Sequence, residues 1–248
     1  MPKFFVKSEQ ISEPYINIIN DDVNHIKNVL RLNIGDLIQI CNSDSGQNYS
    51  SIIEKIENSY IKCKINEILN STSESNVYIH IFQGLPKADK MELIIQKCTE
   101  LGANEITPVN MERSVVKINI KEEKKIKRWQ KIAEAASKQS GRDKIIKVNN
   151  VLQFQYINQS INEFDAFIVT YENEKTINLK TELLKLRNIE NPKIGILIGP
   201  EGGIDLKEIE YLSNTNAKIV TLGKRILRTE TVALAVCSII QYELERNN

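Results

Sequence analysis

Hydrophobic and polar residues alternate with a period of two in three segments near the N-terminus, a pattern typical of half-buried β-strands. The segments are residues 36–41, 49–56 and 60–68, and a turn-rich loop over residues 42–48 separates the first two. Because short antiparallel strands joined by turns commonly close on themselves, we expect residues 1–70 to form a small β-barrel.

One segment of this first part has a helical pattern instead. Over residues 21–30 the apolar side chains recur at helical spacing, and Asp22 is a candidate N-cap. The residues expected on the buried face are Val23, Ile26, Val29 and Leu30. The sequence therefore predicts one short helix beside the strands.

After the polar residues 71–76, which we interpret as a linker, strand-like and helix-like segments alternate. Short apolar runs predict strands at residues 77–83, 105–109, 166–171, 193–198 and 217–222. Helical spacing links Met91, Ile94, Ile95, Cys98 and Leu101, and likewise Ile126, Trp129, Ile132, Ala133 and Ala136. Asp205 and Glu208 resemble a capping box, and a last helix is expected over residues 230–245. This alternation predicts an α/β domain over residues 77–248.

Composition and charge weigh against some classes of function but do not identify one. The 248 residues carry 33 Lys+Arg against 32 Asp+Glu, so a nucleic-acid partner would have to bind local basic patches. The four cysteines are far apart and the chain has two histidines, so we expect reduced thiols and no metal site. The N-terminus has no signal-like region and no apolar run is long, so we expect a cytoplasmic protein without membrane contact.

Two glycine-containing loops are the strongest candidates for a ligand site. The first, residues 199–203, reads Gly-Pro-Glu-Gly-Gly and follows a predicted strand. The second, residues 222–231, follows the next strand and opens the last helix, with Thr229 as a candidate N-cap. Ligands of open parallel sheets bind beyond the carboxyl ends of the strands, so we expect the loops to share one site. Taken alone, either loop could also be a tight turn without a ligand.

Two further segments could contact RNA, although each could also be an ordinary solvated helix end. Residues 83–90 place Lys87 and Lys90 at the end of a strand, where they could meet phosphate. Residues 135–142 end a helix, with Gly141 at the position expected for a C-cap. The candidate contacts there are Lys138, Gln139 and Arg142.

Three absent motifs weigh against common alternatives. No G-x-G-x-x-G follows a strand, which weighs against a dinucleotide site. The chain also lacks a G-x-x-x-x-G-K-[ST] phosphate loop and the G-x-S-x-G turn of α/β-hydrolases.

The two loops carry a family resemblance. Ile198-Gly199-Pro200-Glu201-Gly202-Gly203 is followed by Leu222-Gly223-x-x-Ile226-Leu227-Arg228-x-Glu230-Thr231. Further matches are His25-x-x-x-Val29-Leu30-Arg31 with Gly35-Asp36, Lys97-x-x-Glu100-Leu101-Gly102, Arg113-Ser114, Glu134-Ala135 and Gln139-Ser140-Gly141-Arg142. In this order they resemble the SPOUT class of RNA methyltransferases, and more narrowly the RsmE family, which methylates N3 of a uridine in 16S ribosomal RNA. The chain departs from the family in a loop with few glycines, residues 42–46, and in Val232 after Thr231.

The resemblance implies a two-part architecture. It consists of an N-terminal PUA-like β-barrel for RNA and a C-terminal α/β domain that threads a deep trefoil knot and binds S-adenosylmethionine. It also implies a homodimer that acts on 16S ribosomal RNA or the 30S subunit. The pattern of residues alone would not predict a knot, because knots are very rare.

The resemblance also assigns roles to residues. It implies that the cofactor is bound by Ile198, Gly199, Pro200, Glu201, Gly202, Gly203, Leu222, Gly223, Ile226, Leu227 and Thr231. Arg228 would stabilise negative charge on the uracil oxygens, and Glu230 or Glu201 would accept the N3 proton, unless Glu230 only orients Arg228. The expected RNA contacts are Arg31, Lys87, Lys90, Lys138, Gln139 and Arg142.

Three other functions stay open on the sequence alone. The chain could be a non-catalytic RNA-binding factor in ribosome assembly, or a SPOUT methyltransferase acting on another RNA such as tRNA. It could also be a nucleotide-binding transferase that uses the glycine loop for phosphate.

Overall fold

Two compact units make up the protein, as seen in a computed structural model that describes residues 1–70, 73–116 and 123–246. The N-terminal unit contains Met1–Glu74 and, from later in the chain, Ser137–Ile145. The C-terminal unit contains Ser75–Ala136 and Ile146–Asn248. Part of the expected linker, residues 71–72, lies outside the described residues.

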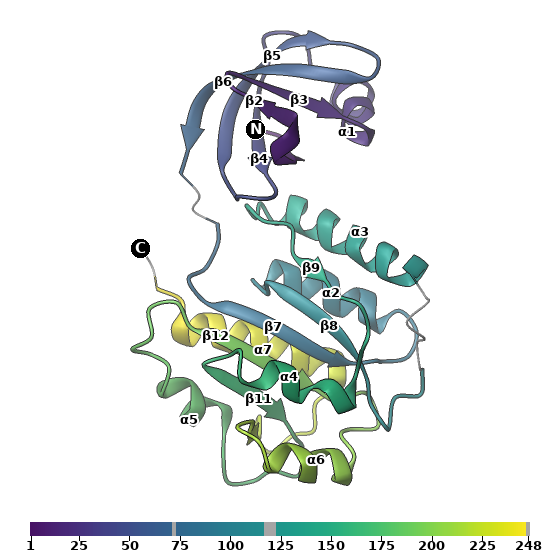
Figure 1. Cartoon of the computed structure of the whole chain (residues 1–248), viewed down its shortest axis with the longest axis vertical. Coiled ribbons are helices and arrows are strands. Elements are labelled where there is room, and N and C mark those ends of the chain that lie inside the picture. The colour runs from purple at the N-terminus through teal and green to yellow at the C-terminus, as the bar shows by residue number, and fades with distance from the viewer. Residues whose placement is uncertain (71–72, 117–122, 247–248) are drawn as a thin grey trace. The chain divides into compact units, whose positions relative to one another are not determined.

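The N-terminal unit is built on one curved sheet of six strands (Figure 1). Its order is β1-β4-β5-β6-β3-β2, and every pairing is antiparallel except that of β1 with β4. The strands are β1 (Lys3–Val6), β2 (Ile11–Ser12), β3 (Tyr15–Ile19), β4 (Leu37–Asn42), β5 (Asn48–Ile56) and β6 (Tyr60–Leu69). Alternate residues of β4, such as Ile38 and Ile40, are fully buried, which confirms the period-two pattern.

The predicted helix of this unit is shorter and differently wound. Helix α1 (Asp21–Asn24) is followed by a π-helical turn over His25–Val29, and Asn20 occupies the N-cap position without a side-chain cap. Val23 and Ile26 are buried as predicted, but Val29 and Leu30 are 62% and 38% exposed. A π turn adds a residue to the helical turn, so side chains beyond it rotate off the buried face. The prediction was wrong for these two residues.

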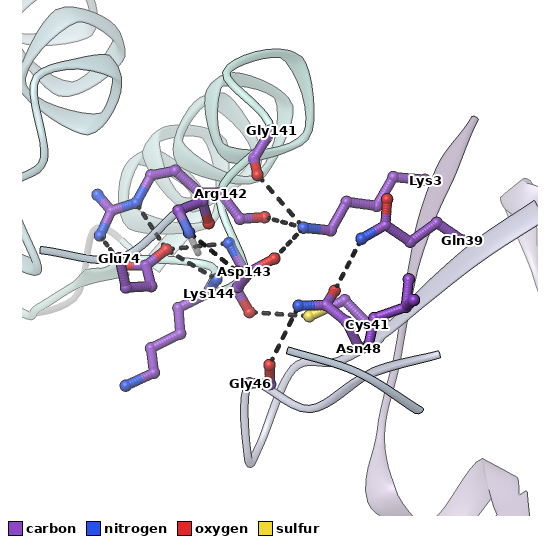
Figure 2. A network of polar contacts seen from close by, with 12 residues as sticks. Lys3, Gln39, Cys41, Gly46, Asn48, Glu74, Gly141, Arg142, Asp143 and Lys144 are labelled. Atoms are coloured by element: carbon purple, nitrogen blue, oxygen red, sulfur yellow. Dashed lines mark hydrogen bonds and ion pairs between the residues drawn. The ribbon is translucent and has the colours of Figure 1, made fainter. Parts of the chain in front are cut away.

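A polar network fixes the Ser137–Ile145 segment within the N-terminal unit (Figure 2). The Arg142 guanidinium forms an ion pair with Glu74, with 2.6 Å between Nη2 and Oε2. Glu74 Oε1 also accepts hydrogen bonds from the backbone N–H groups of Asp143 and Lys144, at 2.9 and 3.2 Å. Lys3 pairs with the Asp143 carboxylate. The sequence placed this segment in the domain of residues 77–248, whereas in the structure it packs within the N-terminal unit.

We expect Glu74→Gln to destabilise the N-terminal unit by about 3 kcal/mol or more, because it removes the carboxylate that pairs with the buried Arg142 guanidinium. The two side chains are 13% and 6% exposed, so water cannot compensate. Urea unfolding followed by circular dichroism measures the loss. The exposed Glu67→Gln on β6 is the matched control. Equal stability of the two variants would contradict the structural role of the pair.

The C-terminal unit is a parallel sheet of seven strands with helices on both faces (Figure 1). Its order is β10-β8-β7-β12-β11-β13, and β9 also pairs with β8. The strands are β7 (Tyr78–Gly84), β8 (Glu105–Asn110), β9 (Lys147–Val148), β10 (Leu152–Gln153), β11 (Ala166–Thr170), β12 (Lys193–Ile198) and β13 (Lys218–Val220). The five predicted strands are confirmed to within one residue at each end, except that β13 ends two residues before its predicted end. The sequence did not predict β9 or β10, because a strand of only two residues is too short to show a repeating pattern.

Alternate strand residues face two separate cores. Residues such as Ile81 and Ile196 pack under one set of helices: α2 (Lys90–Glu100), α3 (Glu123–Gln139), α5 (Leu179–Leu184) and α7 (Thr229–Leu244). Their neighbours Phe82 and Leu197 pack under α4 (Asn158–Ile161) and α6 (Leu206–Ser213). Burial on both faces explains why these strands appear as continuous apolar runs in the sequence. None of the described helices is long and apolar enough to cross a membrane.

A buried histidine lies in β7 and should make folding pH-dependent. His80 is 9% exposed, stacks on Phe82 at 4.1 Å between ring centroids, and lies 2.7 Å from the Thr107 hydroxyl through Nε2. Burial lowers its pKa to about 4, and this outweighs the opposing attraction of Glu105. The imidazole is therefore neutral in the folded protein near neutral pH.

We expect the free energy of unfolding to fall by up to about 3 kcal/mol as the pH drops from 6.5 to 4. The unfolded chain takes up a proton below its ordinary histidine pKa of about 6.5, whereas the folded chain does so only near 4. Urea midpoints at pH 7.5 and 4.5 measure the slope. His80→Gln should flatten it, and His25→Gln, at an exposed position, should not. A His80→Gln variant with the wild-type slope would contradict this assignment.

Candidate active site

Three neighbouring parallel strands end at one cavity of about 410 Å³. The cavity is lined by residues that follow β11, β12 and β13, together with the start of α7. Its volume lies in the range of small-molecule and cofactor sites, and its place at the carboxyl edge of the sheet is where open α/β folds bind ligands. The two loops selected from the sequence therefore meet at one site.

The glycine loop after β12 makes a tight turn against its own end. Gly203 has a φ of +71° and donates its N–H to the Pro200 carbonyl at 2.9 Å. A side chain at Gly199 would meet Ile204 Cγ1 at 2.9 Å, so the turn closes only without one. Asp205 and Glu208 then start α6 with the predicted capping box, each accepting a backbone N–H at 3.0 Å. Backbone groups thus line the cavity.

Thr229 ties the two loops together, although not as the N-cap predicted for it. The N-cap is Arg228, which makes no side-chain cap, and Thr229 is the first residue of α7. Its hydroxyl donates to the Gly199 carbonyl at 2.6 Å and accepts from Gln83 Nε2 at 2.8 Å. Gln83 is fully buried at the end of β7. This chain of hydrogen bonds joins β7, the glycine loop and α7 behind the cavity.

Most of the expected cofactor residues line the cavity. They are Ile198, Gly199, Pro200, Glu201, Gly203, Leu222, Gly223, Ile226 and Leu227. Gly202 and Thr231 are not among the lining residues. Gly202 faces Arg113, whose Nη1 donates to the Gly202 carbonyl at 3.2 Å, and Thr231 is exposed on the first turn of α7.

The two expected catalytic residues lie in different settings. Arg228 lines the cavity and is exposed. Glu230 is not a lining residue, and its Oε2 lies 3.4 Å from Lys90 Nζ. Lys90 also pairs with Glu201 at 3.0 Å, so the ion pair of Glu230 is with Lys90 rather than Arg228.

The environment of Glu201 disfavours it as a proton acceptor. Burial would raise the pKa of this carboxyl, but hydrogen bonds from the Lys87 backbone N–H and from Lys90 outweigh burial and lower it. A carboxylate that is stabilised in its charged form is a weak base. This weakens the case for Glu201 as the proton acceptor, although it is the one of the two acids that lines the cavity.

The expected RNA contacts divide into exposed and paired side chains. Arg31, with a φ of +53°, and Lys87 and Gln139 are exposed. Lys90 pairs with two carboxylates, and Lys138 pairs with Asp22 at 3.1 Å. Arg142 is 5% exposed and pairs with Glu74, so its guanidinium is not presented to a ligand. The expectation for Arg142 is corrected to a structural role.

Sequence reasoning missed the third wall of the cavity. Thr170, Tyr171 and Glu172 line it at the end of β11, which lies between β12 and β13 in the sheet. The predicted strand at 166–171 was the available signal, because all parallel strands end at the same edge. Unlike the loops after β12 and β13, the residues after β11 contain no glycine that would mark them as a candidate site. In the described part of the chain, no group of metal-binding side chains occurs.

Comparison with known proteins identifies the family. Residues 73–241 match the family model of an RNA methyltransferase domain, and residues 18–66 match that of an RNA methyltransferase PUA domain. The chain is 38% identical to the ribosomal RNA small subunit methyltransferase E of Bacillus subtilis (strain 168), over 99% of this chain and 98% of that protein. It is 32% identical to the protein of the same name from Mesomycoplasma hyopneumoniae (strain 232), over 94% and 96%.

A solved structure agrees with this assignment. The ribosomal RNA small subunit methyltransferase E of Neisseria gonorrhoeae, bound to S-adenosyl methionine, superposes with a TM-score of 0.84 at 26% identity, covering 99% of this chain and 98% of that one. The sequence relatives, the two matched domains and the shared fold together place this chain in the family of ribosomal RNA small subunit methyltransferases E.

Proposed function

We propose that the protein transfers a methyl group from S-adenosylmethionine to N3 of a uridine in 16S ribosomal RNA of the small ribosomal subunit. The observation that carries the proposal is the cavity at the ends of β11, β12 and β13 in a chain of this family. The position N3 and the uridine are implied by the RsmE resemblance of the loop sequences.

The lining residues fit S-adenosylmethionine. Gly199, Gly203 and Gly223 line the cavity, where the lack of a side chain lets a ligand come close to the backbone, and Ile198, Leu222 and Leu227 offer apolar surface for an adenine ring. Lys224 and Arg225 supply positive charge for a carboxylate or for RNA phosphate. When bound, S-adenosylmethionine supplies a methyl group already activated on a sulfonium.

The residues of the chain would do three things for the transfer. The loops would hold donor and base in line and exclude water. Arg228 would stabilise the negative charge that builds on the uracil oxygens as N3 loses its proton. Glu230, held by Lys90, would accept that proton. Because N3 lies on the Watson–Crick edge, the uridine must be unpaired when it enters the site.

The proposal extends to assembly and substrate binding. RNA binding belongs to the N-terminal unit and its exposed Arg31 and Gln139, with Lys87 near the cavity. The chain acts in the cytoplasm as a homodimer, and its C-terminal part threads a trefoil knot. In favour of the knot, β12 pairs between β7 and β11, and Thr229 returns the chain to Gly199 and Gln83.

Mass spectrometry of ribosomal RNA tests the proposal. A strain without the gene should lack one N3-methyluridine in 16S RNA, and purified protein with S-adenosylmethionine should restore it on 30S subunits from that strain. An unchanged 16S RNA with altered tRNA would instead favour a methyltransferase for another RNA. Failure of the protein to bind S-adenosylmethionine in calorimetry would favour an assembly factor without catalysis.

A further inference from the structure

One acidic side chain in the cavity has no partner and no role in the proposal above. Glu172 lies two residues beyond the end of β11 and lines the cavity together with Thr170 and Tyr171. It is exposed, and within the described residues it has neither a hydrogen bond nor an ion pair. The other acid that lines the cavity, Glu201, is already bonded to Lys87 and Lys90.

The glycine loop leaves room for this carboxylate. A side chain at Gly203 would collide with Glu172 Oε1, which is the nearest atom to that position. Gly203 also has a φ of +71°, so both its conformation and its surroundings favour glycine. The carboxylate of Glu172 therefore lies directly beside the loop after β12.

The backbone around Glu172 is fixed on both sides. Before it, the Tyr171 N–H donates to the Val220 carbonyl at 3.0 Å. After it, Glu174 accepts hydrogen bonds from Thr176 and Ile177, the backbone ones at 2.7 and 3.1 Å, and these bonds lower its pKa to about 2. The Thr221 N–H then donates to the Ile177 carbonyl at 2.8 Å. The backbone that carries Glu172 is therefore fixed at the rim of the cavity, which lowers the cost of ordering its carboxylate on a ligand.

The chemistry of the position favours a pair of hydroxyl groups. An ionised carboxylate only accepts hydrogen bonds, and its two oxygens match the two donors of a vicinal diol. An acid near the end of one strand, beside a glycine loop on the adjacent strand, is also the arrangement by which dinucleotide folds bind ribose. We propose that Glu172 accepts hydrogen bonds from the ribose hydroxyls of the methyl donor. This role rests on the proposed function, because it presumes the donor in this cavity.

Calorimetry with two ligands tests the role of Glu172. S-adenosylmethionine carries the ribose together with its ammonium, carboxylate and sulfonium groups, whereas 5′-methylthioadenosine keeps the adenine and the ribose but none of these charged groups. Glu172→Gln and Glu172→Ala are expected to lower the affinity for both ligands by a similar factor of about ten. Glu210→Gln, an exposed acid on α6, is the matched control and should bind both as the wild type does. Thermal unfolding of each variant confirms that it is folded.

The outcomes separate this role from its rivals. Lower affinity for S-adenosylmethionine with unchanged affinity for 5′-methylthioadenosine would overturn the ribose assignment, because it would point to a cationic group of the donor, the ammonium or the sulfonium. Unchanged affinity for both ligands would overturn any contact. A wild-type protein that binds neither ligand would overturn the proposed function itself, and the role of Glu172 with it.

Discussion

Arg228→Ala is expected to transfer methyl groups to 16S RNA about 100- to 1,000-fold more slowly than the wild type, with little loss of S-adenosylmethionine binding. The guanidinium lines the cavity at the N-terminus of α7, where it can donate to uracil oxygens as they gain charge. In the proposed site the donor is held mainly by backbone of the two loops, so its affinity should depend little on this side chain. Single-turnover transfer with 30S subunits measures the rate, and calorimetry measures binding.

Two comparison variants sharpen this test. Arg228→Lys keeps the charge but not the planar fork, so it should recover only part of the rate. Lys180→Ala removes an exposed cation from α5, outside the cavity, and should transfer at the wild-type rate. If Arg228→Ala transferred as fast as Lys180→Ala, the proposed catalytic role would be excluded.

Gly84→Ala is expected to weaken S-adenosylmethionine binding about tenfold or more, although residue 84 does not line the cavity. The added methyl would lie 2.7 Å from the backbone nitrogen and Cδ of Pro200, and 2.8 Å from Met111 Sδ. Backbone atoms cannot yield as a flexible side chain can, so the glycine loop must move. The same shift would strain the hydrogen bond from Thr229 to Gly199. Calorimetry at a temperature where the variant is folded measures the effect.

Gly202→Ala is the matched comparison within the loop. Its methyl would meet Arg113 Cβ at 3.1 Å and the Arg113 carbonyl oxygen at 3.3 Å, which are longer contacts than those at Gly84, and residue 202 does not line the cavity. We expect binding close to that of the wild type, although the family motif includes this glycine. A larger loss in Gly202→Ala than in Gly84→Ala would contradict the packing described between the ends of β7 and β12.

The sequence was sufficient for the strands and most of the cavity because both depend on local patterns. Buried parallel strands such as Lys193–Ile198 are continuous apolar runs, and the loops after them carry glycines that need special backbone angles. Gly202 and Thr231 were selected because they stand within a motif. A motif specifies which residues follow one another in the sequence, whereas the direction in which each residue points depends on the geometry of the turn.

Other features depended on contacts that no local pattern carries. The π turn at His25–Val29 turned Val29 and Leu30 outward, although their spacing fits an α-helical face. Arg142 was expected to contact RNA, because its ion-pair partner Glu74 lies 68 residues earlier and no local pattern links the two. Glu172 has no glycine beside it to mark the end of β11 as part of the site. Each of these required the three-dimensional neighbours to be known.

The return of Ser137–Ile145 to the N-terminal unit has a consequence for the order in which the protein is made. The strands β1 to β6 leave the ribosome first, but Glu74 can form its ion pair only after Arg142, 68 residues further on, has been synthesised. At ordinary rates of translation this takes roughly 3 to 14 seconds. During that interval the first-made unit lacks the segment that neutralises Glu74 and Lys3, while β7, α2 and β8 are already emerging. The unit synthesised first is thus completed only after more than a third of its neighbour exists, and no single cut in the chain releases it whole.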